Sequence, residues 1–116
     1  MSPTARTLGW LREHSIEAQV VERRIPHGHT TIDLFGCIDI VALDGSILGI
    51  QTTTGDHHAN RVAKALEEPR LVGWMKCGGR FEVWSWTKSA KWKVWERRIS
   101  MARLDGDRLV FRLKQA

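Results

Sequence analysis

Two apolar runs separated by a short turn dominate the centre of the chain, at residues 35–43 and 46–53. The turn contains Asp44-Gly45, and this dipeptide between two apolar runs is a strong signal for a β-hairpin. Asp39 lies inside the first run, which is otherwise apolar. A carboxylate in an apolar strand costs free energy unless it is paired, hydrogen-bonded or bound to a metal. The sequence therefore predicts a central hairpin that carries a polar site.

The register of this hairpin decides whether its polar side chains can act together. Residues directly opposite each other in an antiparallel pair share a face. A two-residue turn would place Gln51 on the face away from Asp39, whereas a three-residue turn pairs Leu43 with Ile47 and sets Asp39 opposite Gln51. A bulge in either strand has the same effect, and bulges are common beside active sites. We therefore predict a three-residue turn or a bulge.

Helices and further strands are expected on both sides of the hairpin. Ser2-Pro3 is a typical helix start, with Ser as the N-cap and Pro at the first helical position. We expect one α/β domain over residues 1–116, a mixed sheet flanked by helices in the order α-β-β-β-α-β-β with a short last strand. The expected helices cover residues 3–14, 57–67 and 69–76, and the other expected strands cover residues 17–25, 80–86, 91–99 and 108–113.

Charge is unevenly distributed along the chain, whose net charge is +5. Residues 1–58 hold four basic and seven acidic side chains, a net −3. Residues 59–116 hold 14 basic and six acidic side chains, a net +8. An acidic half and a basic half in one small domain suit a polyanionic partner beside a cation-binding pocket. The alternative is charge that serves solubility alone.

Cysteine usage and hydropathy bear on the compartment. Cys37 and Cys77 are too few for a disulfide framework, so we expect two buried, reduced thiols. No apolar run approaches the roughly 18 residues of a membrane span. The first residues of the chain lack the apolar stretch of a secretory signal. These features predict a cytoplasmic protein without a membrane partner.

Asp39 and the polar end of the second central strand match the needs of metal-dependent phosphodiester cleavage. Hard cations bind carboxylate oxygens, and a metal lowers the pKa of bound water and neutralises charge on the phosphate. Two adjacent strands supply such a site when one offers an Asp and the next offers two side chains two residues apart, because those positions share a face. Gln51 and Thr53 have this spacing.

With these residues the chain resembles the PD-(D/E)XK nuclease superfamily, in particular its small Holliday-junction-resolvase-like and phage-associated members. The resemblance covers about residues 8–86. It rests on a G-x-x-D strand at residues 36–39, an apolar strand that ends at the (D/E)-x-K position, and a following helix with Arg61 and Lys64. It implies a restriction-endonuclease-like fold, a homodimer, a bacterial or phage-infected cell, and a Mg²⁺- or Mn²⁺-dependent endonuclease acting on DNA, including branched or structured DNA.

The resemblance also implies roles for individual residues. Asp39 corresponds to the metal-binding aspartate, Gln51 to the second acidic ligand and Thr53 to the lysine. Glu22 and Asp33 are the candidates for further metal ligands. Gln51 can give a metal only a neutral carbonyl oxygen, and Thr53 carries no positive charge. Two interpretations therefore remain open: a degenerate but active nuclease, and a nuclease-fold protein that binds nucleic acid without cutting it.

Aromatic and basic residues are interleaved in the expected hairpin of residues 80–99. Such a pattern can stack on bases and hold phosphates. Alternatively, half of its tryptophans cover the core, and an exposed patch would also suit a homo-oligomeric interaction protein. The expected nucleic-acid contacts are Arg61, Lys64, Lys88, Lys91, Lys93, Arg97 and Arg98.

Four histidines flank the central strands: His27, His29, His57 and His58. His57 or His58 is a candidate to contact a phosphate or a water beside the acidic site. The four together also offer a looser set of Zn²⁺ ligands. The alternative is that they occupy loop and helix ends without a functional role.

Overall fold

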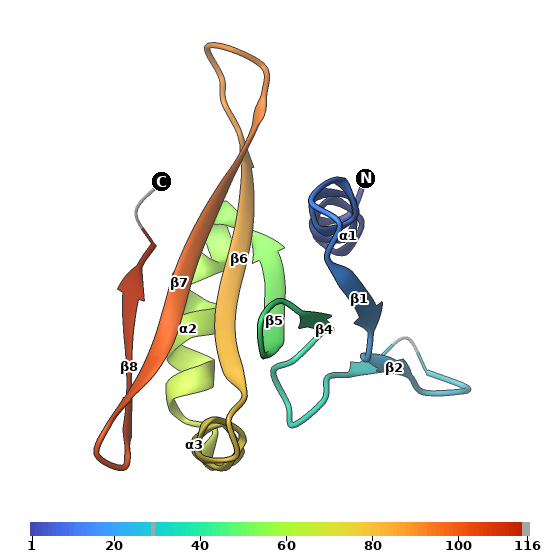
Figure 1. Cartoon of the computed structure of the whole chain (residues 1–116). Coiled ribbons are helices and arrows are strands. Elements are labelled where there is room, and N and C mark those ends of the chain that lie inside the picture. Colours follow the sequence, from blue (N-terminus) through green and yellow to red (C-terminus); the bar gives the residue numbers. More distant parts are fainter. Residues whose placement is uncertain (29, 115–116) are drawn as a thin grey trace.

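Six strands form one mixed sheet in the computed structural model, which describes residues 1–28 and 30–114 (Figure 1). They are β1 (Glu17–Val20), β4 (Ile40–Leu43), β5 (Ile47–Thr54), β6 (Arg80–Lys88), β7 (Trp95–Asp105) and β8 (Arg108–Leu113). The sheet order is β1-β4-β5-β6-β7-β8. β5 and β6 are parallel, whereas the other neighbouring strands are antiparallel. This arrangement agrees with the predicted α/β class.

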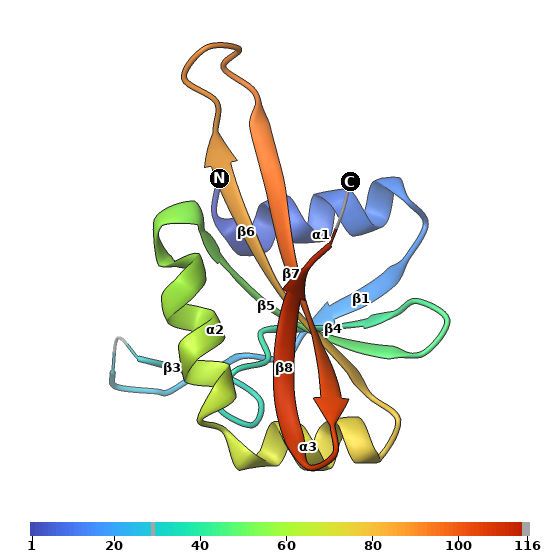
Figure 2. The ribbon, with the colours of Figure 1, turned by 90° about the vertical axis from the view of Figure 1, so that its left-hand side faces the viewer.

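Helices cover the sheet from two sides (Figure 2). The helices are α1 (Pro3–Glu13), α2 (His58–Leu66) and α3 (Pro69–Lys76), with a 3-10 turn η1 (Gly55–His57) before α2. One hydrophobic cluster lies between α1 and the sheet, and a second lies between α2, α3 and the opposite face. A separate two-stranded ribbon consists of β2 (Arg23–Arg24) and β3 (Thr31–Ile32). Because β5 and β6 are parallel, the chain must return between them, and it does so over one face of the sheet through α2 and α3.

The start of α1 forms as predicted. The Ser2 Oγ accepts a hydrogen bond from the Ala5 backbone N–H at 3.1 Å, and Pro3 occupies the first helical position. This bond satisfies one of the N–H groups that a helix leaves without a partner at its N-terminus. Leu11 on the same helix is fully buried against the sheet. The N-terminal turn of α1 is therefore held in a fixed position, which matters for the cleft described below.

Two tryptophans of β6 lie in the core. Trp84 and Trp86 belong to the cluster under α1, while Phe81 and Val83 belong to the cluster under α2. The alternation follows from the two-residue period of a strand buried on both faces. The interpretation that half of the hairpin tryptophans cover the core is thereby confirmed.

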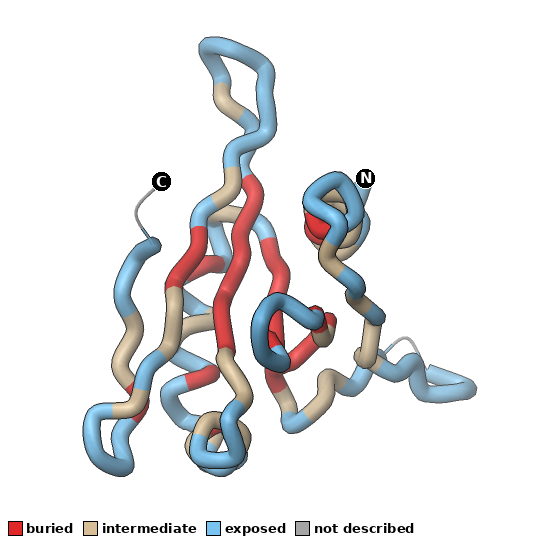
Figure 3. Tube along the Cα trace, viewed as in Figure 1, coloured by how far each residue is buried: buried red, intermediate tan, exposed pale blue. Residues whose placement is uncertain are grey.

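The ends of β6 and β7 project beyond the rest of the sheet, together with the loop between them (Figure 1). We call residues 87–96 the arm. Its surface is almost entirely exposed, whereas the lower part of β6 is buried (Figure 3). β7 begins at Trp95 rather than at residue 91, because residues 89–94 form the loop, with Lys93 at φ 57°. β7 also continues to Asp105, beyond its expected end.

Two predicted strands are wrong in their extent. The expected strand over residues 35–43 begins only at Ile40, because Phe35 and Gly36 adopt positive φ values of 52° and 77° and form a turn. The expected strand over residues 17–25 is interrupted after Val20. The expectation of two buried thiols is also wrong, since Cys37 is buried but Cys77 is exposed. Among the described residues, no helix is long and apolar enough to span a membrane.

Candidate functional site

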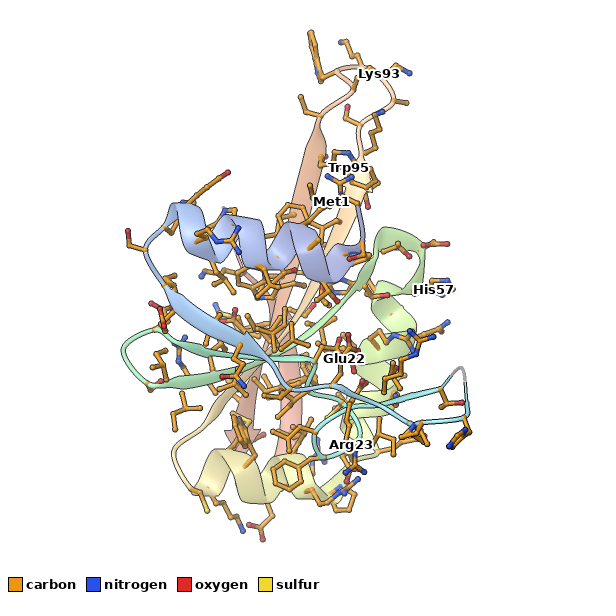
Figure 4. All side chains as sticks on the ribbon, turned by 90° about the vertical axis from the view of Figure 1, so that its right-hand side faces the viewer. Met1, Glu22, Arg23, His57, Lys93 and Trp95 are labelled. Carbon is orange, nitrogen blue, oxygen red and sulfur yellow. The ribbon has the colours of Figure 1, made fainter. Side chains whose placement is uncertain are left out.

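A cleft with a volume of about 440 Å³ opens beside the carboxyl end of β5. Its walls come from the first turn of α1, from α2 and from the segment around β3. Figure 4 views this side of the molecule, with Glu22 and His57 labelled below α1. The predicted site residues Glu22, Asp33, Asp39, Gln51 and Thr53 all line this cleft.

The β4–β5 turn has the register that the site requires. Leu43 pairs with Ile47, so residues 44–46 form a three-residue turn, with Gly45 at φ 74°. Glycine adopts this positive φ without the steric cost of a side chain. The register places Asp39 beside Gln51, and the Gln51 Nε2 donates a hydrogen bond to the Asp39 Oδ2 at 2.9 Å. The prediction of a three-residue turn is confirmed.

Asp39 is only 4% exposed. Besides the Gln51 amide, the backbone N–H of Thr52 donates to the same Oδ2 at 2.9 Å. Both bonds fix the orientation of the carboxylate, and no arginine or lysine pairs with it among the described residues. The carboxylate is therefore held in place without a counter-charge from a basic side chain.

Backbone irregularities bring two more acidic residues to Asp39. The Asp39 carbonyl accepts hydrogen bonds from both Val21 and Glu22, at 2.8 and 3.3 Å, so two residues after β1 oppose one residue of the neighbouring chain. This arrangement turns the backbone in the manner of a bulge, beside the cleft. Asp33, directly after β3, accepts a bond from the Gln51 Nε2 at 3.3 Å. One carboxylate oxygen each of Glu22, Asp33 and Asp39 lies within 4.8 Å of the others.

Two of the three carboxyl groups, those of Asp39 and Glu22, have raised pKa values. Burial raises the pKa of Asp39 to about 8, with further contributions from Asp33 and from the charge of Glu22. Burial and the neighbouring Asp33 also raise the pKa of Glu22. Desolvation and like charge both disfavour the ionised form of a carboxyl group. A divalent cation among these oxygens would reverse both effects, because it supplies the missing positive charge.

Gln51 adds an unsatisfied oxygen to the cluster. Its side chain is 3% exposed, and its Oε1 is buried without a hydrogen-bond partner among the described residues. A buried carbonyl oxygen without a partner costs about 1–3 kcal/mol. Rotation of the amide by 180° would direct Oε1 toward Asp33 and Asp39, where it would be a further oxygen ligand for a cation bound among them. The donor set is therefore oxygen-rich and fits a hard divalent cation.

Positive charge lines the opposite wall of the cleft. Arg61 and Lys64, one turn apart on α2, both face it. The Arg61 Nε is buried without a hydrogen-bond partner among the described residues. Thr53 lies on the floor of the cleft, two residues after Gln51 on β5, and the exposed His57 lies at its edge. The cleft thus holds a negative cluster and a positive wall at the same time.

His58 does not reach the cleft. Its Nδ1 lies 2.6 Å from the Ser85 Oγ and its Nε2 lies 2.8 Å from the Ser100 Oγ. Burial, followed by the charge of Arg98, lowers the pKa of His58, so it is held as the neutral ring. Both ring nitrogens are occupied, and the expectation that His58 contacts a ligand is wrong. It instead fixes the start of α2 to β6 and β7.

The looser histidine set does not form a metal site in the described part of the chain. Within that part, the one group of acidic, histidine or cysteine ligands with suitable spacing is the acidic cluster, and no histidine belongs to it. His29, a member of the expected set, lies outside the described residues. His57 lines the cleft but does not belong to the acidic cluster.

The basic residues of the predicted hairpin divide into two groups. Lys88, Lys91 and Lys93 are exposed on the arm. The Arg97 guanidinium instead lies 3.7 Å from the ring centroid of Trp10 and 4.6 Å from that of Trp84. Arg97 is therefore partly buried under α1, and its expected contact with nucleic acid stays a prediction. Arg98 is exposed on the opposite face, next to His58.

The contribution of α1 to the cleft is absent from the sequence-based prediction. Pro3 and Thr4 line the cleft, and Arg6 lies over the Trp95 ring of the arm at 3.5 Å from the centroid. No spacing rule connects the first helical turn with strands 40 residues later. The exposed Ser2-Pro3 start was visible as a helix cap, but a cap does not indicate which strand it faces.

Comparisons of the chain with protein-family models, with curated proteins and with solved structures return no match. The functional assignment therefore depends on the chemistry of the cleft: one cluster of oxygen ligands, one unsatisfied amide oxygen, and two basic side chains across from them.

Proposed function

We propose that the protein is a metal-dependent endonuclease that hydrolyses phosphodiester bonds in DNA, including branched or structured DNA. The observation that carries this proposal is the convergence of Glu22, Asp33 and Asp39 beside the unpartnered Gln51 Oε1. Asp39, directly before β4, is buried at a cost in folding free energy, which a bound cation would offset. Arg61 and Lys64 across the cleft provide the charge that a phosphate needs.

Each residue has a defined part in this proposal. Asp39, Asp33 and Glu22 would hold Mg²⁺ or Mn²⁺, with Gln51 contributing its carbonyl oxygen. A bound divalent cation supplies charge neutralisation and a water of lowered pKa. The Thr52 N–H keeps the Asp39 carboxylate oriented.

The remaining side chains would act on the substrate. Lys64 and Arg61 would bind the non-bridging oxygens of the scissile phosphate, since charge-assisted hydrogen bonds to phosphate are the stronger kind. The Thr53 hydroxyl would donate to or accept from the attacking water. The water oxygen bonds to phosphorus and the water gives up one proton, one bridging P–O bond breaks, and the departing oxygen takes up a proton.

A second candidate is a protein of this fold that binds nucleic acid without cleaving it. The specific observation in its favour is that the Gln51 Nε2 already hydrogen-bonds to both Asp33 and Asp39. These bonds satisfy the carboxylates partly without any ion. Thr53 also lacks the positive charge that a lysine would bring to that position.

Cleavage assays separate the two candidates. We would incubate the protein with linear, single-stranded and four-way-junction DNA in Mg²⁺, Mn²⁺ or EDTA. Metal-dependent cleavage that falls by about 100-fold or more in Asp39→Asn would support the enzyme. Asp105→Asn, at the exposed end of β7, is the matched control and should cleave like the wild type.

The other outcomes are equally informative. Salt-sensitive binding without cleavage in any metal would support the non-cleaving candidate. Equal cleavage by Asp39→Asn and wild type would remove the acidic cluster from the mechanism. A lack of binding even at low salt would leave a homo-oligomeric interaction protein.

A further inference from the structure

The arm exposes large apolar side chains to solvent. Trp92 is 68% exposed, Trp95 is 42% exposed, and Val94 between them is also exposed. Trp84 and Trp86, on the same hairpin, are buried in the core. Contiguous exposed apolar surface in a soluble domain marks an interaction site. We therefore treat the arm as a candidate binding surface for another molecule.

The tip of the arm is structured. The Ser89 N–H donates to the Val94 carbonyl at 2.7 Å, and the Lys93 N–H donates to the Ser89 carbonyl at 2.9 Å. The Ser89 Oγ also accepts a bond from the Trp92 N–H at 3.2 Å. These bonds hold the backbone that presents Trp92 and Val94. A partner would lose little ordering entropy on binding such a pre-organised surface.

Each exposed tryptophan of the arm has a cation over one face of its ring, so a partner would stack on the other face. The Arg6 guanidinium lies 3.5 Å from the Trp95 centroid, and the Lys91 Nζ lies 4.9 Å from the Trp92 centroid. Lys88 and Lys93 add two further exposed positive charges. Aromatic faces next to positive charge match nucleic-acid bases next to their phosphates.

The arm adjoins the acidic cleft through α1. Pro3 and Thr4 line the cleft, and Arg6, less than one turn further along the helix, contacts Trp95. A hollow of about 500 Å³ lies along α1, and its lining includes Arg6 and Trp86, the residue directly before the arm. In Figure 4, Met1 at the start of α1 lies between the region of Glu22 and the labelled Trp95 and Lys93. A strand that leaves the cleft across the start of α1 would meet the arm.

We propose that the arm binds unpaired nucleotides by stacking their bases on Trp92 and Trp95, so that the preferred substrate carries a single-stranded segment next to the bond in the cleft. This inference rests on the proposed function. The bases of a continuous duplex are stacked on each other and offer no free face to a tryptophan. A second copy docking arm to arm is disfavoured, because it would bring together two arms that each carry three exposed lysines, and like charges repel.

Binding in EDTA tests this without any requirement for cleavage. Fluorescence anisotropy would compare labelled blunt duplex, the same duplex with a 12-nucleotide overhang, and a single-stranded 12-mer. The double variant Trp92→Leu with Trp95→Leu keeps apolar bulk but cannot stack. It should bind the overhang and the 12-mer about 100-fold more weakly, at about tenfold for each lost stack. Blunt-duplex binding should change less than about twofold.

Two controls sharpen the result. Trp92→Phe with Trp95→Phe keeps aromatic faces and should retain most of the overhang affinity. Leu43→Ala with Ile47→Ala removes exposed apolar residues at the β4–β5 turn and should leave binding unchanged. Both comparisons separate stacking from non-specific loss of surface.

Several outcomes would overturn the inference. Equal weakening on blunt duplex and on overhang would make the arm a general backbone contact. A wild-type dimer in sedimentation that dissociates in the leucine variant would make it a self-association surface. If overhang binding depends on the arm but no metal supports cleavage, the nuclease proposal fails and the arm proposal stands. Cleavage with arm-independent binding gives the opposite result.

Discussion

The acidic cleft and the arm are exceptions to two rules of folding: ionisable groups are usually exposed, and large apolar side chains are usually buried. In the cleft, Asp39 is a carboxyl group buried beside the carboxyl groups of Glu22 and Asp33. On the arm, Trp92 is an apolar group in water. Both arrangements lower the stability of the isolated chain, since burial disfavours charge and exposure disfavours apolar surface. The comparison teaches that the residues hardest to explain by folding lie in two places, one that we propose holds a cation and phosphate, the other that we propose binds bases.

The largest expected effect separates core tryptophans from arm tryptophans. Trp84→Ala should lower the free energy of unfolding by about 3–5 kcal/mol, because it leaves a cavity under α1. It also removes the indole N–H that donates to the Glu82 Oε1 at 2.8 Å. Trp92→Ala should change the same free energy by less than about 0.5 kcal/mol. Chemical denaturation of both variants measures the difference, and similar losses would show that the arm belongs to the folded core.

The next effect concerns the acidic cluster. Gln51→Glu adds a fourth carboxylate to it, so the metal-free variant should be less stable by roughly 2 kcal/mol. Millimolar Mg²⁺ should raise its melting temperature more than that of the wild type, because a ligand that binds only the folded state stabilises it. Gln19→Glu, on the exposed side of β1, is the matched control. A variant that is insensitive to Mg²⁺ would contradict the cation site.

Asp39→Asn should change stability in a pH-dependent way without metal. Burial raises the folded-state pKa of Asp39 to about 8, so the folded protein retains a proton that the unfolded chain releases near pH 4. Wild-type stability therefore falls as pH rises from about 4 through 8. The asparagine variant lacks this fall and should be more stable by about 1–3 kcal/mol at pH 9, but not at pH 4. Denaturation series at both pH values in EDTA measure the effect, and a pH-independent difference would contradict it.

The smallest effect belongs to a single charge on the arm. Lys91→Gln should reduce the slope of log K against log salt for single-stranded DNA by about one, which is a few-fold loss of affinity near 0.1 M salt. Lys76→Gln is the control, because Lys76 lies on α3 and pairs with Asp107 at 2.6 Å. An equal change of slope in both variants would mean that the arm makes no particular phosphate contact.

Local signals in the sequence were sufficient for the parts of the fold that local physics determines. Ser2-Pro3 marked the start of α1, and the two-residue period of β6 separated Phe81 from Trp84. Asp39 was identifiable because a carboxylate contradicts its apolar surroundings. The three-residue turn followed from the requirement that Asp39 and Gln51 share a face.

Other features depend on contacts between distant segments. The turn at Phe35 was missed because a positive φ in a non-glycine residue has no propensity signal. Glu22 and Asp33 were named as ligand candidates, but only the folded backbone brings them to Asp39. His58 and Arg97 look like surface residues in the sequence, and both are instead held by partners from other elements.

Gly55, where the chain leaves β5, has a consequence for redesign of the molecule. A methyl group at this residue would overlap the hydroxyl of Thr87, at the root of the arm. The end of β5, which lines the acidic cleft, and the root of the arm thus leave no room for a side chain between them at this residue, so a substitution here affects both. Gly55→Ala should misplace both, and adding Thr87→Ala should restore them, which makes this pair an engineering handle on their relative position.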